Sequence, residues 1–304
     1  MKVLVVGAGA VGSYYGGRLA QAGHDVTFIG RKGHIDAIQN QGLTIDSKIT
    51  GKHNVKVTAA EQLFATKPPD LVLLCVKSLD TLEAAQSLRE FISPQTVVLC
   101  LQNGIDNHEI AGRILGPSRV HPTVIYVGVR ISQPGTVEHV SRGEINFPIQ
   151  LSALTPTFEQ AGIAARSTDN ILGMVWGKLL LNASCNALGM ICGVSFGELA
   201  ASPEMREVIS GAVQEVVQIA ELKGIRIPGE NYPSQVLKTA EGLGVGLSSM
   251  LQDFRAGKRI EIEALNGVVV RLGKELGVPT PFNATFYATA KLLEARKTAA
   301  LISR

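Results

Sequence analysis

The chain has 304 residues, of which 45% are hydrophobic and 18% charged, so it has enough apolar material for two cores and lacks the composition of a disordered chain. Its net charge is +3 and its pI about 8.6, and the basic residues are scattered rather than gathered in runs. This mild balance excludes nucleic acid as an expected partner.

The cysteines and the apolar segments bear on the cellular compartment of the protein. The thiols lie in apolar segments without C-x-x-C spacing, so we expect each to be buried and reduced and predict no metal site; they are Cys75, Cys100, Cys185 and Cys192. The apolar start lacks the features of a signal peptide, and no apolar run is expected to reach the roughly 18 residues that cross a bilayer. The sequence therefore predicts a soluble, cytoplasmic protein without a membrane partner.

A glycine-rich turn opens the chain. "VLVVGAGAVGSYYGG" contains Gly7-x-Gly9-x-x-Gly12 between an expected strand, Lys2–Val6, and an expected helix near Val11–Ala22. In this context the spacing predicts a dinucleotide site, with the pyrophosphate on the helix N-terminus. The residues expected to bind the cofactor here are Gly7, Ala8, Gly9, Ala10, Val11 and Gly12. The alternative is a structural glycine turn that binds nothing.

The end of the second strand, Asp25–Ile29, bears on which dinucleotide is bound. NAD-binding proteins usually place a carboxylate there for the ribose hydroxyl. This chain reads Gly30-Arg31-Lys32, and the Arg31 guanidinium suits a phosphate. The pattern favours NADP(H) over NAD(H), unless these cations are only solvated charges in a loop.

Alternation of strands and helices continues through the first half. Further strands are expected at Leu71–Val76, Thr96–Leu101 and Val120–Val127, with helices at Leu79–Phe91 and Asn107–Leu115. Continuous apolar strands such as "DLVLLCVK" are typical of a parallel sheet covered on both faces. We therefore predict a Rossmann-type doubly wound α/β domain, with the turn-rich "SQPGTVEHVSRGEINF" as a hairpin appended at its far side.

From about Asp169 only helical periodicity remains. Glycines at 224 and 277 give stop signals, and the expected helices are Ile171–Leu188, Pro203–Lys223, Ile262–Leu276 and Phe282–Arg296. The sequence thus predicts a dinucleotide-binding domain over residues 1–167 and an all-α substrate and catalytic domain over 168–304. The helical part has room for a homodimer interface, but no segment identifies one.

The first of these helices carries an unexpected polar stripe. In "WGKLLLNASCN", Lys178, Asn182 and Asn186 are spaced four apart and share one face of a helix. Such groups in an apolar helix are costly unless something polar meets them. The alternative is a lysine that reaches out to solvent and two asparagines that bond neighbouring backbone.

With the glycine turn, Arg31, "CVKS", "LQNG", the stripe and "SSMLQDFRAGKRIEIEALNG", the chain closely resembles the ketopantoate reductase (2-dehydropantoate 2-reductase) family. The resemblance implies NADPH-dependent reduction of the 2-oxo acid 2-dehydropantoate to (R)-pantoate, in pantothenate and coenzyme A biosynthesis. It also implies the two-domain plan of 6-phosphogluconate dehydrogenase, with the active site in the cleft between a Rossmann domain and a helical domain.

The resemblance assigns roles to matching residues. It implies that Lys178 is the proton donor and Glu261 an acidic residue at the catalytic centre. The implied substrate-binding residues are Asn103, Asn182, Asn186 and Ser249, and the implied cofactor contacts beyond the glycine turn and Arg31 are Lys77, Asn103 and Glu261. Read from the residues alone, Asn103-Gly104 is an ordinary turn, Ser249 a helix N-cap and Glu261 a helix-start acid.

One position departs from the family pattern. The family often has an asparagine where this chain has Phe196, in "SFGEL". The difference leaves open a reductase of another 2-oxo acid on the same scaffold. A non-catalytic NADPH sensor is a further alternative, although a sensor has no need of the lysine, asparagines and glutamate together.

Overall fold

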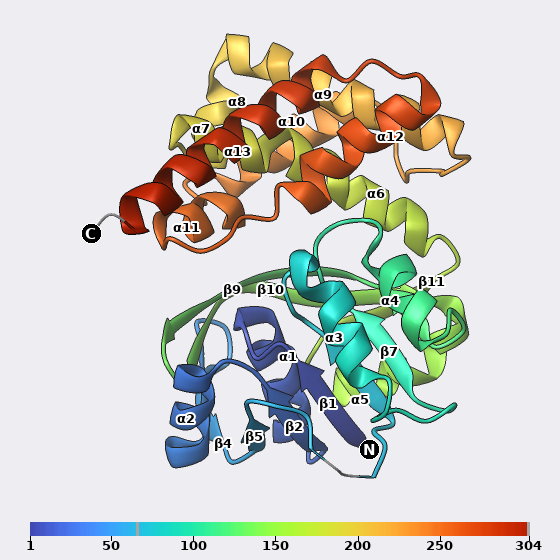
Figure 1. The fold of residues 1–304 in the computed structure, drawn as a ribbon, viewed down its shortest axis with the longest axis vertical. Coiled ribbons are helices and arrows are strands. Elements are labelled where there is room, and N and C mark those ends of the chain that lie inside the picture. The colour runs from blue at the N-terminus through green and yellow to red at the C-terminus, as the bar shows by residue number, and fades with distance from the viewer. Residues whose placement is uncertain (65–66, 303–304) are drawn as a thin grey trace. The chain divides into compact units, whose positions relative to one another are not determined.

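Figure 1 shows the computed structural model of the chain, which describes residues 1–64 and 67–302. It consists of two compact units. Unit 1 comprises Met1–Gln102 with Asp106–Ile171, and unit 2 comprises Asn103–Ile105 with Leu172–Arg304. The contacts thus divide the chain between residues 171 and 172, whereas the sequence suggests a division between 167 and 168, and they group a short loop segment with the helical unit.

Unit 1 contains a six-stranded parallel sheet. In the order in which they pair, its strands are β5 (Thr58–Ala60), β2 (Asp25–Ile29), β1 (Lys2–Val6), β6 (Leu71–Leu74), β7 (Val97–Cys100) and β8 (Val120–Pro122). Numbered along the chain within this sheet, the order is 3-2-1-4-5-6, which is that of Rossmann folds. The order reverses between β1 and β6, and ligands of such sheets bind at the carboxyl ends of the strands there. The predicted doubly wound sheet is confirmed.

Helices cover both faces of this sheet (Figure 1). The helices of unit 1 are α1 (Ala10–Gln21), α2 (Lys32–Gln41), η1 (Ser78–Asp80), α3 (Thr81–Leu88), α4 (Asn107–Leu115), η2 (Ile149–Leu154) and α5 (Thr155–Gln160). Alternate residues of β1 point to opposite faces: Val3 and Val5 join the core cluster that includes α1, and Leu4 and Val6 join the cluster that includes α3 and α4. Both faces are therefore buried, as the continuous apolar strands predict.

A second sheet packs on the other side of α1. Its strands pair in the order β11 (Ala165–Thr168), β10 (Thr136–Pro148), β3 (Leu43–Ser47) and β4 (Gly51–Val55), and β9 (Val124–Gln133) also pairs with β10. The segment predicted as a hairpin, residues 132–147, contains only the end of β9, the turn and most of β10, so the hairpin begins earlier in the chain. Its description as an appendage of the first sheet is wrong, because both strands belong to the second sheet. The strand expected at Val120–Val127 is divided at Thr123, whose hydroxyl donates to the Cys100 carbonyl at 2.5 Å, so that β8 and β9 belong to different sheets.

His34 connects three parts of unit 1. Its Nδ1 accepts a hydrogen bond from the Gly135 backbone at 3.0 Å, so the neutral ring carries its proton on Nε2, which lies 3.1 Å from the Ser13 hydroxyl. Burial lowers the pKa of His34 below its ordinary value of 6.5. Since the unfolded chain binds this proton more readily, stability is fully present above about pH 6.5 and is lost as the pH falls through the lowered pKa.

His34→Gln, which keeps a neutral hydrogen-bonding side chain, is therefore expected to reduce the loss of Tm between pH 7.5 and pH 5 by about 1–2 °C. Thermal unfolding followed by circular dichroism across that range measures the difference. His53→Gln, at an exposed histidine, is the control. A pH dependence of His34→Gln identical to that of the wild type would contradict the assignment.

Unit 2 is helical, and its described residues contain no strand. Its elements are α6 (Ile171–Leu181), η3 (Asn182–Asn186), α7 (Ala187–Cys192), α8 (Phe196–Ala201), α9 (Pro203–Leu222), α10 (Tyr232–Leu243), α11 (Ser249–Arg255), η4 (Glu263–Gly267), α12 (Val268–Leu276) and α13 (Pro281–Ile302). The Ser202 hydroxyl caps α9 with Pro203 at its start, and the predicted stops at Gly224 and Gly277 are confirmed by positive φ angles of 68° and 72°. The expected helices do not include α8, α10 or α11, although the alternative reading of Ser249 as an N-cap implies a helix start at α11.

The helical run from Ile171 to Cys192 is long and apolar enough to span a membrane by length and composition. The expectation that no segment of the chain reaches that length is therefore wrong. In its most apolar window, however, 72% of the residues are buried within the structure, as in the core helix of a globular unit.

The four cysteines have free thiols, but they differ in exposure. Burial raises the pKa of Cys100 to about 12 and of Cys185 to about 11, and it raises the pKa of Cys75 as well. Cys192, at the end of α7, is exposed. The prediction of a buried thiol is wrong for this residue.

Candidate functional site

Two glycines of the turn after β1 are required by the packing of unit 1 itself. Gly7 has a φ of 103°, and a Cβ there would lie 2.5 Å from the backbone nitrogen of Val76. A Cβ on Gly12 would lie 2.3 Å from the Gly7 carbonyl oxygen. The turn therefore fits against the segment that follows β6 only because both positions lack side chains.

Gly9 is different, because the described structure gives no reason of its own for a glycine there. Its φ is −81°, which any residue adopts, and an added Cβ would meet no atom within 4 Å. Gly9 is the N-cap of α1, and no side chain caps that end of the helix. Backbone N–H groups at a helix start favour an anion, and the open space above Gly9 allows close approach. The turn, with Ala10 and Val11 in the first helical turn, fits a dinucleotide pyrophosphate.

The end of β2 lies beside this turn. A Cβ on Gly30 would lie 2.7 Å from the Cβ of Ala8, so the two segments are in contact. Arg31 follows directly, is exposed, and occupies the N-cap position of α2 without a side-chain capping bond. The Arg31 guanidinium thus belongs to the residue that follows Gly30, which contacts Ala8 of the glycine turn.

Lys77 and the loop after β7 occupy the same edge of the sheet. Lys77 follows β6, the strand beside β1, and is half-buried. Gln102 follows β7, and its amide nitrogen donates to the Thr81 hydroxyl at 2.6 Å, which donates to Oδ1 of Asn107 at 2.8 Å. These bonds attach Gln102 to the starts of α3 and α4, and Asn103 is the next residue along the chain.

The polar stripe of unit 2 includes a π turn that the sequence does not reveal. The segment expected as one regular helix passes from α6 through η3 into α7, and η3 closes its backbone bonds over five residues instead of four. In an α-helix a four-residue step overshoots a full turn by about 40°. The wider π turn reverses that drift, so Asn186 returns toward the line of Lys178. Asn182 and Asn186 are 9% and 3% exposed, and Lys178 is half-buried.

Helix α11 is capped by Ser248 and not by Ser249. The Ser248 hydroxyl accepts from the Leu251 backbone nitrogen at 3.1 Å and donates to the Asn186 carbonyl at 3.1 Å. The interpretation of Ser249 as the N-cap is therefore wrong. Ser248 is buried and bonds to the helix that carries the stripe, whereas Ser249, the first residue of α11, is exposed.

Glu261 lies just before η4 and is 6% exposed. Within unit 2, the Asn103 side-chain amide donates to Glu261 Oε2 at 3.4 Å. A carboxylate favoured only by a helix dipole is usually solvated, whereas a buried one needs hydrogen-bond donors. The structure therefore gives Glu261 a polar partner, and that partner is another predicted site residue.

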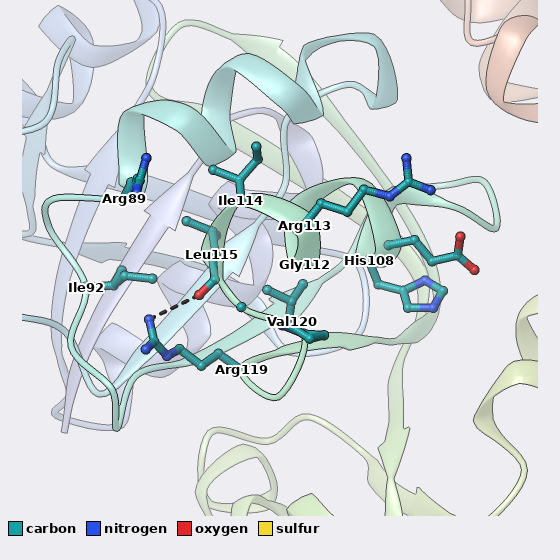
Figure 2. Close-up of a pocket in the computed structure, with 12 residues that line it drawn as sticks. Arg89, Ile92, His108, Gly112, Arg113, Ile114, Leu115, Arg119 and Val120 are labelled. Carbon is teal, nitrogen blue, oxygen red and sulfur yellow. Dashed lines mark hydrogen bonds between the residues drawn. The ribbon is translucent and has the colours of Figure 1, made fainter.

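The cavity shown in Figure 2 lies elsewhere. It has a volume of about 730 Å³, lies around α4 and β8 of unit 1, and is lined by none of the predicted site residues. The side chains of Arg89, Arg113 and Arg119 point in different directions in Figure 2, and Arg119 donates to the Leu115 carbonyl at 3.1 Å. They do not converge on one anion, so the cavity does not identify the site.

The structure brings several predicted residues together. Asn103 meets Glu261, Asn182 and Asn186 both lie in η3, and Ser249 follows Ser248, which bonds to the Asn186 carbonyl. The glycine turn, Arg31 and Lys77 lie at one sheet edge of unit 1. The catalytic and binding roles of all these residues stay predictions. Ser248 and Asn266 were not predicted, although Asn266 is a polar residue among apolar neighbours in an expected helix, the same signal that marks the stripe.

Comparison with known proteins gives matches along most of the chain. Residues 3–150 match the family described as ketopantoate reductase PanE/ApbA, and residues 170–294 match the C-terminal family of the same description. A 2-dehydropantoate 2-reductase of Pyrococcus horikoshii is 34% identical, over 97% of this chain and 98% of the relative.

Solved structures show the same fold. The PanE/ApbA family ketopantoate reductase of Ralstonia eutropha is 37% identical and superposes with a TM-score of 0.93, over 98% of this chain and all of that one. A D-mandelate dehydrogenase, solved with NADH and anilino(oxo)acetate, has a TM-score of 0.91 at 24% identity, over 98% of this chain and 100% of that chain. The fold is thus shared by proteins with different named substrates.

Proposed function

The chain belongs to the ketopantoate reductase family, and we propose that it is an NADPH-dependent oxidoreductase that reduces 2-dehydropantoate to (R)-pantoate. The observation that carries the proposal is the buried stripe, in which Asn182 and Asn186 present amides from a π turn in an apolar helix. Buried amides need polar partners, and a 2-oxo acid supplies them. We place the enzyme in the cytoplasm.

The cofactor site fits a nicotinamide dinucleotide, since Gly9 is open and the α1 N-terminus is uncapped by side chains. When bound, NADPH supplies the hydride that reduces the ketone carbon. In this proposal the glycine turn binds the pyrophosphate and Arg31 binds the 2′-phosphate. Lys77 contacts the cofactor at the same edge of the sheet.

Reduction of the ketone places negative charge on its oxygen, which must receive a proton. Lys178 stabilises that charge with its ammonium group and donates the proton. Glu261 and Asn103, already bonded to each other, orient the reacting groups. Asn182 and Asn186 hold the substrate without adding charge, and the exposed Ser249 hydroxyl meets its carboxylate.

Arg31→Ala is expected to raise the KM for NADPH roughly tenfold or more and to leave the KM for NADH within about twofold, because the guanidinium pairs only with the 2′-phosphate. Lys32→Ala is the matched control, since Lys32 is paired with Asp36 at 3.3 Å and with Glu61 at 3.6 Å. Steady-state kinetics with both cofactors measure the effect. Equal changes with NADPH and NADH would remove Arg31 from the phosphate site.

A reductase of a different 2-oxo acid is the second candidate, favoured by Phe196. This residue begins α8 and is half-buried, and its backbone nitrogen donates to the Gly246 carbonyl at 3.0 Å, on the loop that leads to Ser248. An apolar ring near that loop favours a less polar substrate than an asparagine would.

Steady-state reduction of 2-dehydropantoate and of a panel of 2-oxo acids, followed by loss of NADPH absorbance, tests the proposal. We expect the highest kcat/KM with 2-dehydropantoate and NADPH. A higher value with another 2-oxo acid would establish the second candidate. Binding of NADPH without turnover of any 2-oxo acid would instead indicate a sensor.

A further inference from the structure

The π turn η3 requires donors for carbonyl oxygens that an α-helix would bond internally. Side chains from three places provide them: Ser184 Oγ donates to the Leu180 carbonyl at 2.6 Å, Ser248 Oγ to the Asn186 carbonyl at 3.1 Å, and Asn266 Nδ2 to the Ala183 carbonyl at 2.8 Å. Of the three donors, only Asn266 reaches the middle of the turn from another helical segment. It lies in η4, the second π turn, so the two irregular turns are bonded to each other.

The direction of the Asn266 bond is set by a buried carboxylate. Glu215, on α9, accepts from the backbone nitrogens of Phe282 and Asn283 at 2.8 and 3.0 Å, and from Asn283 Nδ2 at 2.6 Å. Because a carboxylate accepts these bonds, Asn283 must turn its amide nitrogen toward Glu215 and its Oδ1 toward Asn266. Asn266 Nδ2 donates to that oxygen at 2.9 Å. Asn266 is therefore oriented to present its amide nitrogen to the Ala183 carbonyl.

This chain of bonds is closed to solvent. Asn266 and Asn283 are fully buried, and Glu215 is 6% exposed. A carbonyl or amide that loses its partner here has no water to replace it, so each bond is costly to break. The network joins the backbone between Asn182 and Asn186 to η4, α13 and α9 through buried hydrogen bonds.

We propose that Asn266 is a positioning residue for the reduction, which acts through the Ala183 carbonyl on the two asparagines that hold the substrate. The inference rests on the proposed function, since it assumes that Asn182 and Asn186 bind a 2-oxo acid. Without the Asn266 donor, η3 relaxes toward regular α-helical bonding, and Asn186 rotates away from the line of Lys178.

The test compares Asn266→Ala with Leu237→Ala. Leu237 is buried on α10, which packs on α8 and α9, and its truncation lowers stability without touching the network. For Asn266→Ala we expect the KM for 2-dehydropantoate to rise roughly tenfold, while kcat and the Kd for NADPH stay within about threefold. Hydrogen exchange of the segment from residue 178 to 190 should be faster in this variant and unchanged in Leu237→Ala. If the Asn266→Ala variant does not fold, the Asn266→Ser variant is used for the same measurements.

The outcomes separate the two proposals. Unchanged KM and unchanged exchange in the Asn266 variant, or an equal rise of KM in Leu237→Ala, would overturn the positioning role. A wild-type protein that reduces no 2-oxo acid refutes the proposed function alone. In that case hydrogen exchange alone tests whether Asn266 stabilises η3. Faster exchange confined to residues 178–190 in the Asn266 variant supports this stabilisation, and unchanged exchange excludes it.

Discussion

Lys178→Ala is expected to lower kcat at least about 100-fold while the Kd for NADPH stays within about twofold. Lys178 precedes Asn182 by one turn on α6 and is half-buried. In the proposed mechanism its ammonium group stabilises the charge that develops on the ketone oxygen and then delivers the proton. The glycine turn and Arg31, the proposed phosphate-binding residues, lie in unit 1, so we expect the substitution to leave those contacts unchanged. Steady-state turnover and a fluorescence titration with NADPH measure the two quantities.

One control variant separates proton donation from positive charge, and a second tests whether the effect is specific to Lys178. Lys178→Arg keeps the positive charge, but a guanidinium does not release its proton near neutral pH, so kcat should stay low. Lys223→Ala removes an exposed lysine from the same unit and should behave as the wild type. Near-normal kcat in Lys178→Ala would assign the proton to another donor.

Gly12→Ala and Gly9→Ala are expected to fail in different ways, although both change the same motif. A Cβ on Gly12 would lie 2.3 Å from the Gly7 carbonyl oxygen, which is backbone and cannot move aside, so we expect a loss of at least about 2 kcal/mol of stability. A Cβ on Gly9 meets nothing within 4 Å. Gly9→Ala should therefore keep the wild-type Tm and raise the Kd for NADPH at least about tenfold, because the methyl group would occupy the proposed place of the pyrophosphate.

Thermal unfolding without cofactor, combined with NADPH titration, distinguishes these results. Ala10→Gly, in the first turn of α1, changes the same segment without adding bulk and serves as a comparison. Wild-type affinity in Gly9→Ala would show that no phosphate lies above that residue. A stable Gly12→Ala would show that the turn can open, contrary to the packing described.

The parts of the fold that local pattern determines were predictable. β1, β2 and α4 have the predicted bounds, because apolar runs end at clear turn residues and the helix starts after Asp106. β3 and β4 were missed for a physical reason. Four of the five residues of β4 are exposed, so this edge strand has no apolar alternation. β4 pairs only with β3, and β3 joins the sheet by pairing with the distant β10. Long-range pairing of this kind leaves little trace in local sequence.

The candidate site shows the same limit. The stripe was visible because asparagines are unexpected in an apolar helix, but the π turn that aligns it adds no sequence signal. The choice between Ser248 and Ser249 as the cap depends on the bond to the Asn186 carbonyl, which joins segments 62 residues apart. Patterns therefore identified the chemical groups, and the structure supplies the bonds that orient them.

The unequal exposure of the thiols has a practical consequence. Thiolates are the reactive form of cysteine, and burial suppresses them at Cys75, Cys100 and Cys185. A maleimide fluorophore is thus directed to Cys192 in the native protein, without removal of the others. The dye would sit at the C-terminal end of the helical run that carries the stripe, about one and a half turns beyond Asn186, which gives a single labelling position on that run.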